Sequence, residues 1–167
     1  MALNLFTDKF NDLSEDAPLC RWLIQGIKVD IMPTDKNILG FSNQWYPFAI
    51  KTAQNKQINP QLSIKLVTPT CFLATKIEAF EGRGHNDYWA SSDLEDIIIL
   101  IDGRPEIVHE IKAAEPNLHD YLVKKIHSFL QNERFLEALS VHFALDEINQ
   151  QRFPIIKKRL EQCLEPK

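Results

Sequence analysis

The chain has 167 residues, of which 44% are hydrophobic and 25% charged. This composition is typical of one globular domain and excludes a disordered or fibrous chain. The chain has 19 basic and 23 acidic residues, so its formal charge is -4. This charge argues against a broad surface for nucleic acid or an anionic membrane.

The cysteines and the N-terminus indicate an intracellular protein. Cys20, Cys71 and Cys163 are odd in number and far apart, so we expect three buried thiols rather than a disulfide framework or a zinc site. The first residues reach Thr7-Asp8-Lys9 too soon for a signal peptide, and no apolar run of about 18 residues could span a bilayer. We therefore expect a cytoplasmic protein with no membrane partner.

The first 69 residues are expected to form mainly strands. Cys20–Ile24 and Ile27–Met32 flank the two-residue turn Gln25-Gly26, as in a tight hairpin, and Pro33 would end the second strand. A third strand, Leu62–Val67, alternates apolar and polar residues. These patterns predict at least three strands with one buried face.

From Thr70, a candidate cap, the apolar spacing becomes helical. A capping box at Ser92-Asp93-Leu94-Glu95 precedes a second, mostly buried helix, and helical patterns follow over residues 105–113 and 118–130 and in two more segments that reach Leu164. The expected fold is α/β in the α+β sense: one domain, 1–167, with a small mixed or antiparallel sheet in 1–69 packed against the helices of 70–167.

Judged by spacing alone, most of the charged candidate residues have a structural explanation and need no catalytic role. Asp30 shares a strand face with Lys28, which is typical of a solvated face. Lys76 lies among apolar residues of a helix, where most lysines extend to water, and Asp93 suits a helix N-terminus. Asp96, on the flank of a buried helix, has no such local explanation.

The loop around Arg83 fits two readings equally well. Arg83 lies between two glycines and is followed by His85 and by polar and aromatic residues, so the segment is either a ligand-binding loop or an ordinary connection between helices. The histidines and cysteines show no metal-binding spacing, and no serine or cysteine nucleophile pattern is present. If the chain is an enzyme, we expect its catalytic side chains to be carboxylates and a lysine.

Several ordered motifs resemble the bacterial nucleotidyltransferase fold, in the group that includes toxin components of toxin–antitoxin systems. The similarity runs from about Ala17 to Ile111 and is carried by residues 17–22, 29–33, 39–43, 75–80, 82–84 and 92–97.

This resemblance implies a DNA-polymerase-β-like core that uses Mg²⁺ to transfer a nucleoside monophosphate from a nucleoside triphosphate. Asp30 would be a catalytic carboxylate and the metal ligand. Lys76 would be catalytic and would bind the nucleotide with Arg83 and Asp93, while Asp96 would be a further catalytic carboxylate. We expect Asp30, Lys76 and Asp96 to share one cleft.

The family's Gly-Ser turn and Asp-x-Asp pair should precede Ala17, yet residues 1–16 contain neither. One aspartate cannot hold two metal ions. The chain is therefore a fragment of an enzyme, a partner that completes another polypeptide, or a domain that has lost the reaction. The expected function is a nucleotidyltransferase-like protein with incomplete transfer chemistry, and the alternative is a non-catalytic module. Its partners would be a nucleoside triphosphate, a protein or a second copy.

Overall fold

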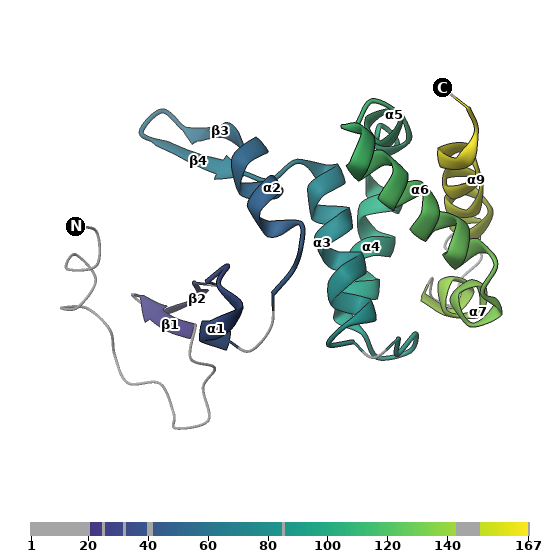
Figure 1. Cartoon of the computed structure of the whole chain (residues 1–167), viewed down its shortest axis with the longest axis horizontal. Helices are drawn as coiled ribbons and strands as arrows, with labels where there is room; N and C mark the ends of the chain where they lie inside the picture. The colour runs from purple at the N-terminus through teal and green to yellow at the C-terminus, as the bar shows by residue number, and fades with distance from the viewer. Residues whose placement is uncertain are drawn as a thin grey trace. The chain divides into compact units, whose positions relative to one another are not determined.

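The computed structural model describes residues 21–24, 26–31, 33–39, 42–84, 86–142 and 151–166 (Figure 1). By its internal contacts the chain divides into two compact units, Met1–Ser42 and Asn43–Lys167. The candidate residues are divided between these units, because Asp30 belongs to the first and the other candidates belong to the second.

The first unit contains the predicted hairpin. Strands β1 (Arg21–Ile24) and β2 (Ile27–Asp30) are antiparallel, with Trp22 opposite Val29, and the short helix α1 (Lys36–Leu39) follows. Gly26 has φ +82°, a left-handed conformation that glycine adopts without strain. The hairpin is confirmed, although its second strand ends at Asp30 and does not include the predicted Ile31. Cys20, Gln25 and Met32 lie outside the described residues.

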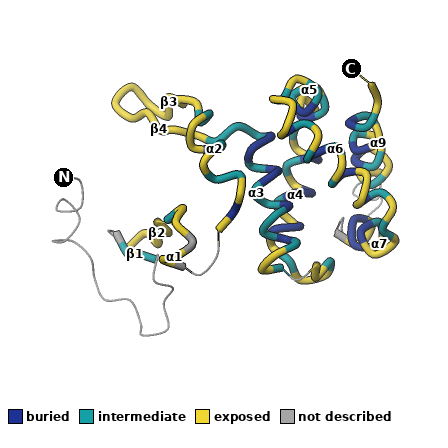
Figure 2. Tube along the Cα trace, in the orientation of Figure 1, coloured by how far each residue is buried: buried dark blue, intermediate teal, exposed yellow. Residues whose placement is uncertain are grey.

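The second unit begins with helix α2 (Tyr46–Thr52) and a second hairpin, β3 (Gln54–Asn59) and β4 (Leu62–Leu66). The strand predicted at 62–67 is present, but its predicted buried face is wrong. Every residue of β3 and β4 is exposed, as the yellow tube in Figure 2 shows. The described strands therefore form two separate two-stranded sheets instead of one sheet of three or more strands packed on helices.

Helices make up the rest of the second unit: α3 (Pro69–Glu81), α4 (Ser92–Gly103), α5 (Ile107–Lys112), α6 (Pro116–Leu130), α7 (Glu133–His142) and α9 (Arg152–Leu164). Thr68, rather than the expected Thr70, caps α3, because its hydroxyl accepts from the Cys71 N–H and Pro69 takes the first helical position. Ser91, one residue before the expected box, caps α4.

The hydrophobic core lies between these helices, where apolar side chains at helical spacing meet. Its largest fully buried members include Leu73, Ile77, Phe80, Leu94, Ile97, Leu122, Ile126 and Phe135. Cys71 and Cys163 are free and buried, as predicted. Among the described residues, no helix is both long and apolar enough to cross a membrane.

Candidate functional site

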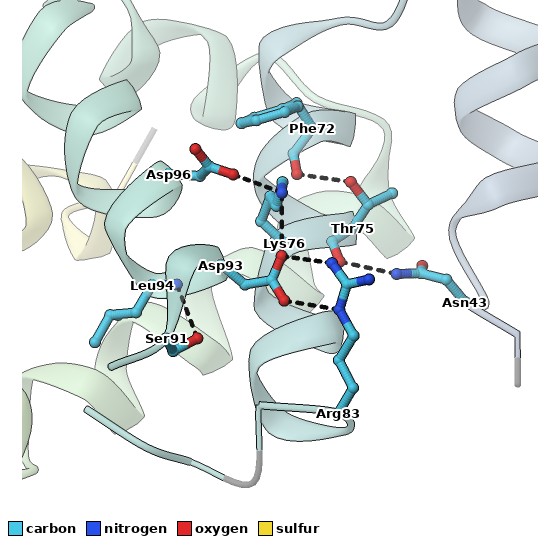
Figure 3. A network of polar contacts seen from close by, with 9 residues as sticks. All are labelled: Asn43, Phe72, Thr75, Lys76, Arg83, Ser91, Asp93, Leu94 and Asp96. Carbon is cyan, nitrogen blue, oxygen red and sulfur yellow. Dashed lines mark hydrogen bonds and ion pairs between the residues drawn. The ribbon is translucent and has the colours of Figure 1, made fainter. Parts of the chain in front are cut away.

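An ion cluster joins α3 to α4 (Figure 3). Lys76, near the middle of α3, extends its ammonium between two carboxylates of α4: Nζ lies 3.0 Å from Asp93 Oδ1 and 2.5 Å from Asp96 Oδ2. Asp93 and Asp96 are three residues apart, so both face α3 from one side of their helix. Lys76 Nζ also lies 5.6 Å from the centre of the Phe72 ring, within reach of a cation–π contact.

A second cation, Arg83, reaches the same aspartate from the loop after α3. Its Nε and Nη2 donate to the two oxygens of Asp93 at 2.9 and 2.8 Å, the two-pronged geometry that a guanidinium makes with a carboxylate. The two side chains differ sharply in exposure: that of Asp93 is 5% exposed and that of Arg83 is 56% exposed. The cluster thus has a buried anion at its base and a cation at the surface.

The charges of the cluster stabilise one another. Burial would lower the pKa of Lys76, but hydrogen bonds to Asp96 and Asp93 outweigh it, so the pKa is raised. Burial would likewise raise the pKa of Asp93, but hydrogen bonds from Arg83 and Lys76 hold it below its usual value. The hydrogen bond to Asp93 raises the pKa of Arg83. All three groups are therefore charged at neutral pH.

Glycine at position 84 lets the loop approach α3 closely enough to place Arg83. A Cβ on Gly84 would lie 2.6 Å from the Phe80 carbonyl oxygen, and the Gly84 N–H donates to the Ala79 carbonyl at 3.0 Å. The loop continues through Asn86, which has φ +55°. His85 lies outside the described residues. Gly84 is therefore required for the close approach of this loop to α3, which places Arg83 beside Asp93.

Asn43 supports the cluster from the other side of α3, a role that the sequence did not reveal. Its side chain is buried, donates to the Thr75 carbonyl at 2.8 Å and accepts from the Trp45 N–H at 3.0 Å. Gln44 adds a hydrogen bond from its N–H to Glu78 at 3.1 Å. The segment before α2 is thus tied to the turn of α3 that carries Lys76. A lone asparagine gives no periodic signal, and its place in the motif at residues 39–43 did not indicate this contact with α3.

Asp30 lies in the first unit, at the end of β2. Its two carboxylate oxygens accept from Arg21 at 2.8 and 2.9 Å, and this hydrogen bond lowers the pKa of Asp30. Of the three residues predicted to share one cleft, Lys76 and Asp96 form an ion pair, and the cleft itself stays a prediction. The inclusion of Asp30 in it is likewise untested.

Among the residues that the structure describes, Asp30 is not part of a group that could hold a metal ion. Within the described ranges, no three His, Cys, Asp or Glu side chains come together as a metal-binding group, and Mg²⁺ in proteins needs near-octahedral oxygen ligation. Asp30 offers one carboxylate, which Arg21 already engages.

The ion pairs of Lys76, Arg83, Asp93 and Asp96 fasten α3 to α4. The half-exposed guanidinium of Arg83 also presents donors that an anion at the surface could accept from. No protein-family model matches the chain, and comparison with characterised proteins and with solved structures finds no significant match.

Proposed function

We propose that this chain is a nucleotidyltransferase-like protein that binds the phosphates of a nucleoside triphosphate at Lys76 and Arg83 and does not complete the transfer reaction by itself. One observation carries the proposal. Four residues that the family resemblance marks as site residues, separated by up to 20 positions, converge in one cluster across α3 and α4.

The two cations are suited to different parts of a polyphosphate. Arg83 is half exposed and presents a planar fork of donors, of which two engage Asp93. Lys76 is a compact charge, 23% exposed, that Asp93 and Asp96 hold in a fixed position. A phosphate oxygen that approached from the Arg83 side would meet donors oriented in advance, which lowers the entropic cost of binding.

The charge balance of the cluster predicts weak binding. Two carboxylates already neutralise the two cations, so a triphosphate must compete with Asp93 and Asp96 for the same donors. Asp96 is the more replaceable competitor, because its side chain is 41% exposed and water can solvate it. We therefore expect nucleotide binding without detectable nucleotidyl transfer.

Calorimetric titration of the full chain with nucleoside triphosphates, with and without Mg²⁺, tests the proposal. Lys76→Ala should abolish binding. The matched control is Lys112→Ala, because Lys112 is also 23% exposed and pairs with Glu165 at 3.7 Å, outside the cluster. Binding that survives Lys76→Ala would refute the role of the lysine, and robust transfer by the isolated chain would refute the claim that the reaction is incomplete.

A second candidate is the non-catalytic module that binds a partner protein. The observation in its favour is the exposed β3–β4 hairpin, whose strands carry apolar side chains that the described residues leave open to solvent. In this case the ion cluster would serve only to hold α3 against α4.

A further inference from the structure

The β3–β4 hairpin has one apolar face. Leu62, Ile64 and Leu66 alternate along β4, so their side chains point to the same face. Their exposed fractions are 48%, 40% and 51%. This is an unusual place for such residues, since an apolar row on a two-stranded hairpin contributes to stability only when something covers it. Figure 1 shows the hairpin extending from α2.

The strand register places a lysine within this face. Residues directly opposite in an antiparallel pair have their side chains on the same face, and Lys56 is opposite Ile64 while Gln54 is opposite Leu66. Lys65 is opposite Asn55 and therefore belongs to the other, polar face. The apolar row is thus bordered by one ammonium group.

The hairpin lies in a segment that contains no acidic residue. From Asn37 to Ile77 the charged residues are all lysines, at positions 51, 56, 65 and 76, although the whole chain has a formal charge of -4. Lys51, Lys56 and Lys65 are exposed. The apolar face thus carries the lysine Lys56 and no carboxylate from the hairpin, which makes it complementary to an apolar surface that carries carboxylates.

We propose that the apolar face and open edge of the β3–β4 hairpin bind an acidic extended segment of a partner protein, which adds a strand to the hairpin. Within the part of the chain that the structure describes, β3 and β4 pair only with each other, so an added strand could pair with the N–H and C=O groups of an outer edge. Alternate apolar side chains of that segment would extend the row formed by Leu62, Ile64 and Leu66. A glutamate on that same face of the segment would pair with Lys56.

Two other occupants fit the surface less well. A second copy that used the same face would bring the Lys56 ammonium groups of both copies together, with no carboxylate in the hairpin to separate them. Single-stranded nucleic acid is usually held by aromatic or arginine side chains as well as by charge. Residues 54–66 contain no Phe, Tyr, Trp or Arg.

The probe is a labelled, end-capped peptide of about eight residues, a length that matches an average strand. Threonine alternates with valine in it, and glutamate replaces one valine, so that the glutamate and the remaining valines lie on the same face. Fluorescence anisotropy should show that it binds the full chain. A peptide with lysine in place of glutamate should not bind. A third peptide, N-methylated along one edge, should bind poorly because it cannot donate backbone hydrogen bonds.

Paired variants test the face. Lys56→Glu should weaken binding about tenfold, whereas Lys65→Glu, the same change on the opposite face, should have a much smaller effect. Ile64→Ser should also weaken binding about tenfold, because it removes buried apolar area, and Ser63→Thr is its control. All four positions are exposed, so the helical circular dichroism should stay the same in each variant.

Four results would overturn the proposal. The first is no binding of the glutamate–valine peptide, and the second is equal weakening by Lys56→Glu and Lys65→Glu, which would indicate nonspecific charge. The third is a dimer in sedimentation that Ile64→Ser dissociates, and the fourth is tight binding of a single-stranded RNA that Lys56→Glu abolishes. Because none of these variants touches the ion cluster, they leave the proposed nucleotide binding unaffected and separable.

Discussion

Asp93→Asn is the most informative change to the ion cluster, because it removes one charge and preserves the shape of the side chain. Asp93 accepts three hydrogen bonds, from Lys76 at 3.0 Å and from Arg83 at 2.9 and 2.8 Å. An asparagine retains one acceptor oxygen but puts an amide donor against a cation. One cation of the cluster then faces a group that repels it.

The size of the effect follows from burial. Breaking a fully buried ion pair costs roughly 3–5 kcal/mol. Two features reduce that cost here: Arg83 is 56% exposed and can turn to water, and Lys76 keeps Asp96 at 2.5 Å. Since a hydrogen bond to a charged group contributes about 1.5–3 kcal/mol, the expected loss is about 2–3 kcal/mol. The midpoint of thermal unfolding should fall by roughly 5–10 °C.

Urea unfolding followed by circular dichroism at pH 7 measures this loss. The control is Asp120→Asn, because the Asp120 side chain is 82% exposed and pairs only with the neighbouring His119 among the described residues. That variant should change the free energy of unfolding by less than about 0.5 kcal/mol. An equally small loss in Asp93→Asn would contradict the geometry of the cluster.

The dependence of folding stability on pH provides an independent test of the cluster. The pKa of Asp93 is lower in the folded chain than in the unfolded one, so its contribution is present above the unfolded pKa and lost as the pH falls through the folded value. The loss therefore begins below about pH 4. The pKa of Lys76 is raised, so its contribution is lost only as the pH rises through the folded value, above about pH 10. Asp93→Asn should therefore flatten the acid limb of the stability curve, and it should weaken the alkaline limb only in part, because Lys76 keeps its ion pair with Asp96.

Two further predictions concern the loop and the thiols. Gly84→Ala should destabilise the fold by about 1–3 kcal/mol, because a Cβ would collide with the Phe80 carbonyl oxygen. Gly103→Ala, where a Cβ meets nothing within 4 Å, should be neutral or stabilise by about 0.4–1 kcal/mol; equal effects in urea unfolding would refute the packing argument. Burial raises the pKa of Cys163 to about 11, so Cys163, and the buried Cys71, should react with a thiol reagent at pH 8 only after unfolding. Their rapid reaction in the native chain would contradict the burial.

Periodicity predicted the helices well and the sheet poorly, for a physical reason. A helix in this chain buries one side against other helices, so apolar spacing around Leu73, Ile77 and Phe80 reported the core directly. Alternation in Leu62–Leu66 reported a strand with two different faces, but it carries no information on what covers the apolar one. The partner strand Gln54–Asn59 is almost wholly polar, so its pattern gave no signal and it was not predicted.

The candidate site shows the same division. The resemblance selected Lys76, Arg83, Asp93 and Asp96 from motifs, and these residues are in contact. Spacing alone favoured a lysine extended to water and an aspartate that serves its own helix N-terminus. Those local interpretations missed the contact because α3 and α4 meet only in the tertiary fold.

Affinity as a function of phosphate number tests the central claim most directly. Calorimetry should compare a nucleoside triphosphate, its diphosphate, its monophosphate and the bare nucleoside on the full chain without added metal, and then on Arg83→Ala. If Lys76 and Arg83 hold phosphates, affinity should fall stepwise as phosphates are removed. In Arg83→Ala the differences in affinity between these ligands should become smaller. Arg104→Ala, which removes an ion pair with Glu110 elsewhere in the second unit, should leave the series unchanged. The account would be contradicted by a bare nucleoside that binds as tightly as the triphosphate, or by an unchanged dependence of affinity on phosphate number in Arg83→Ala.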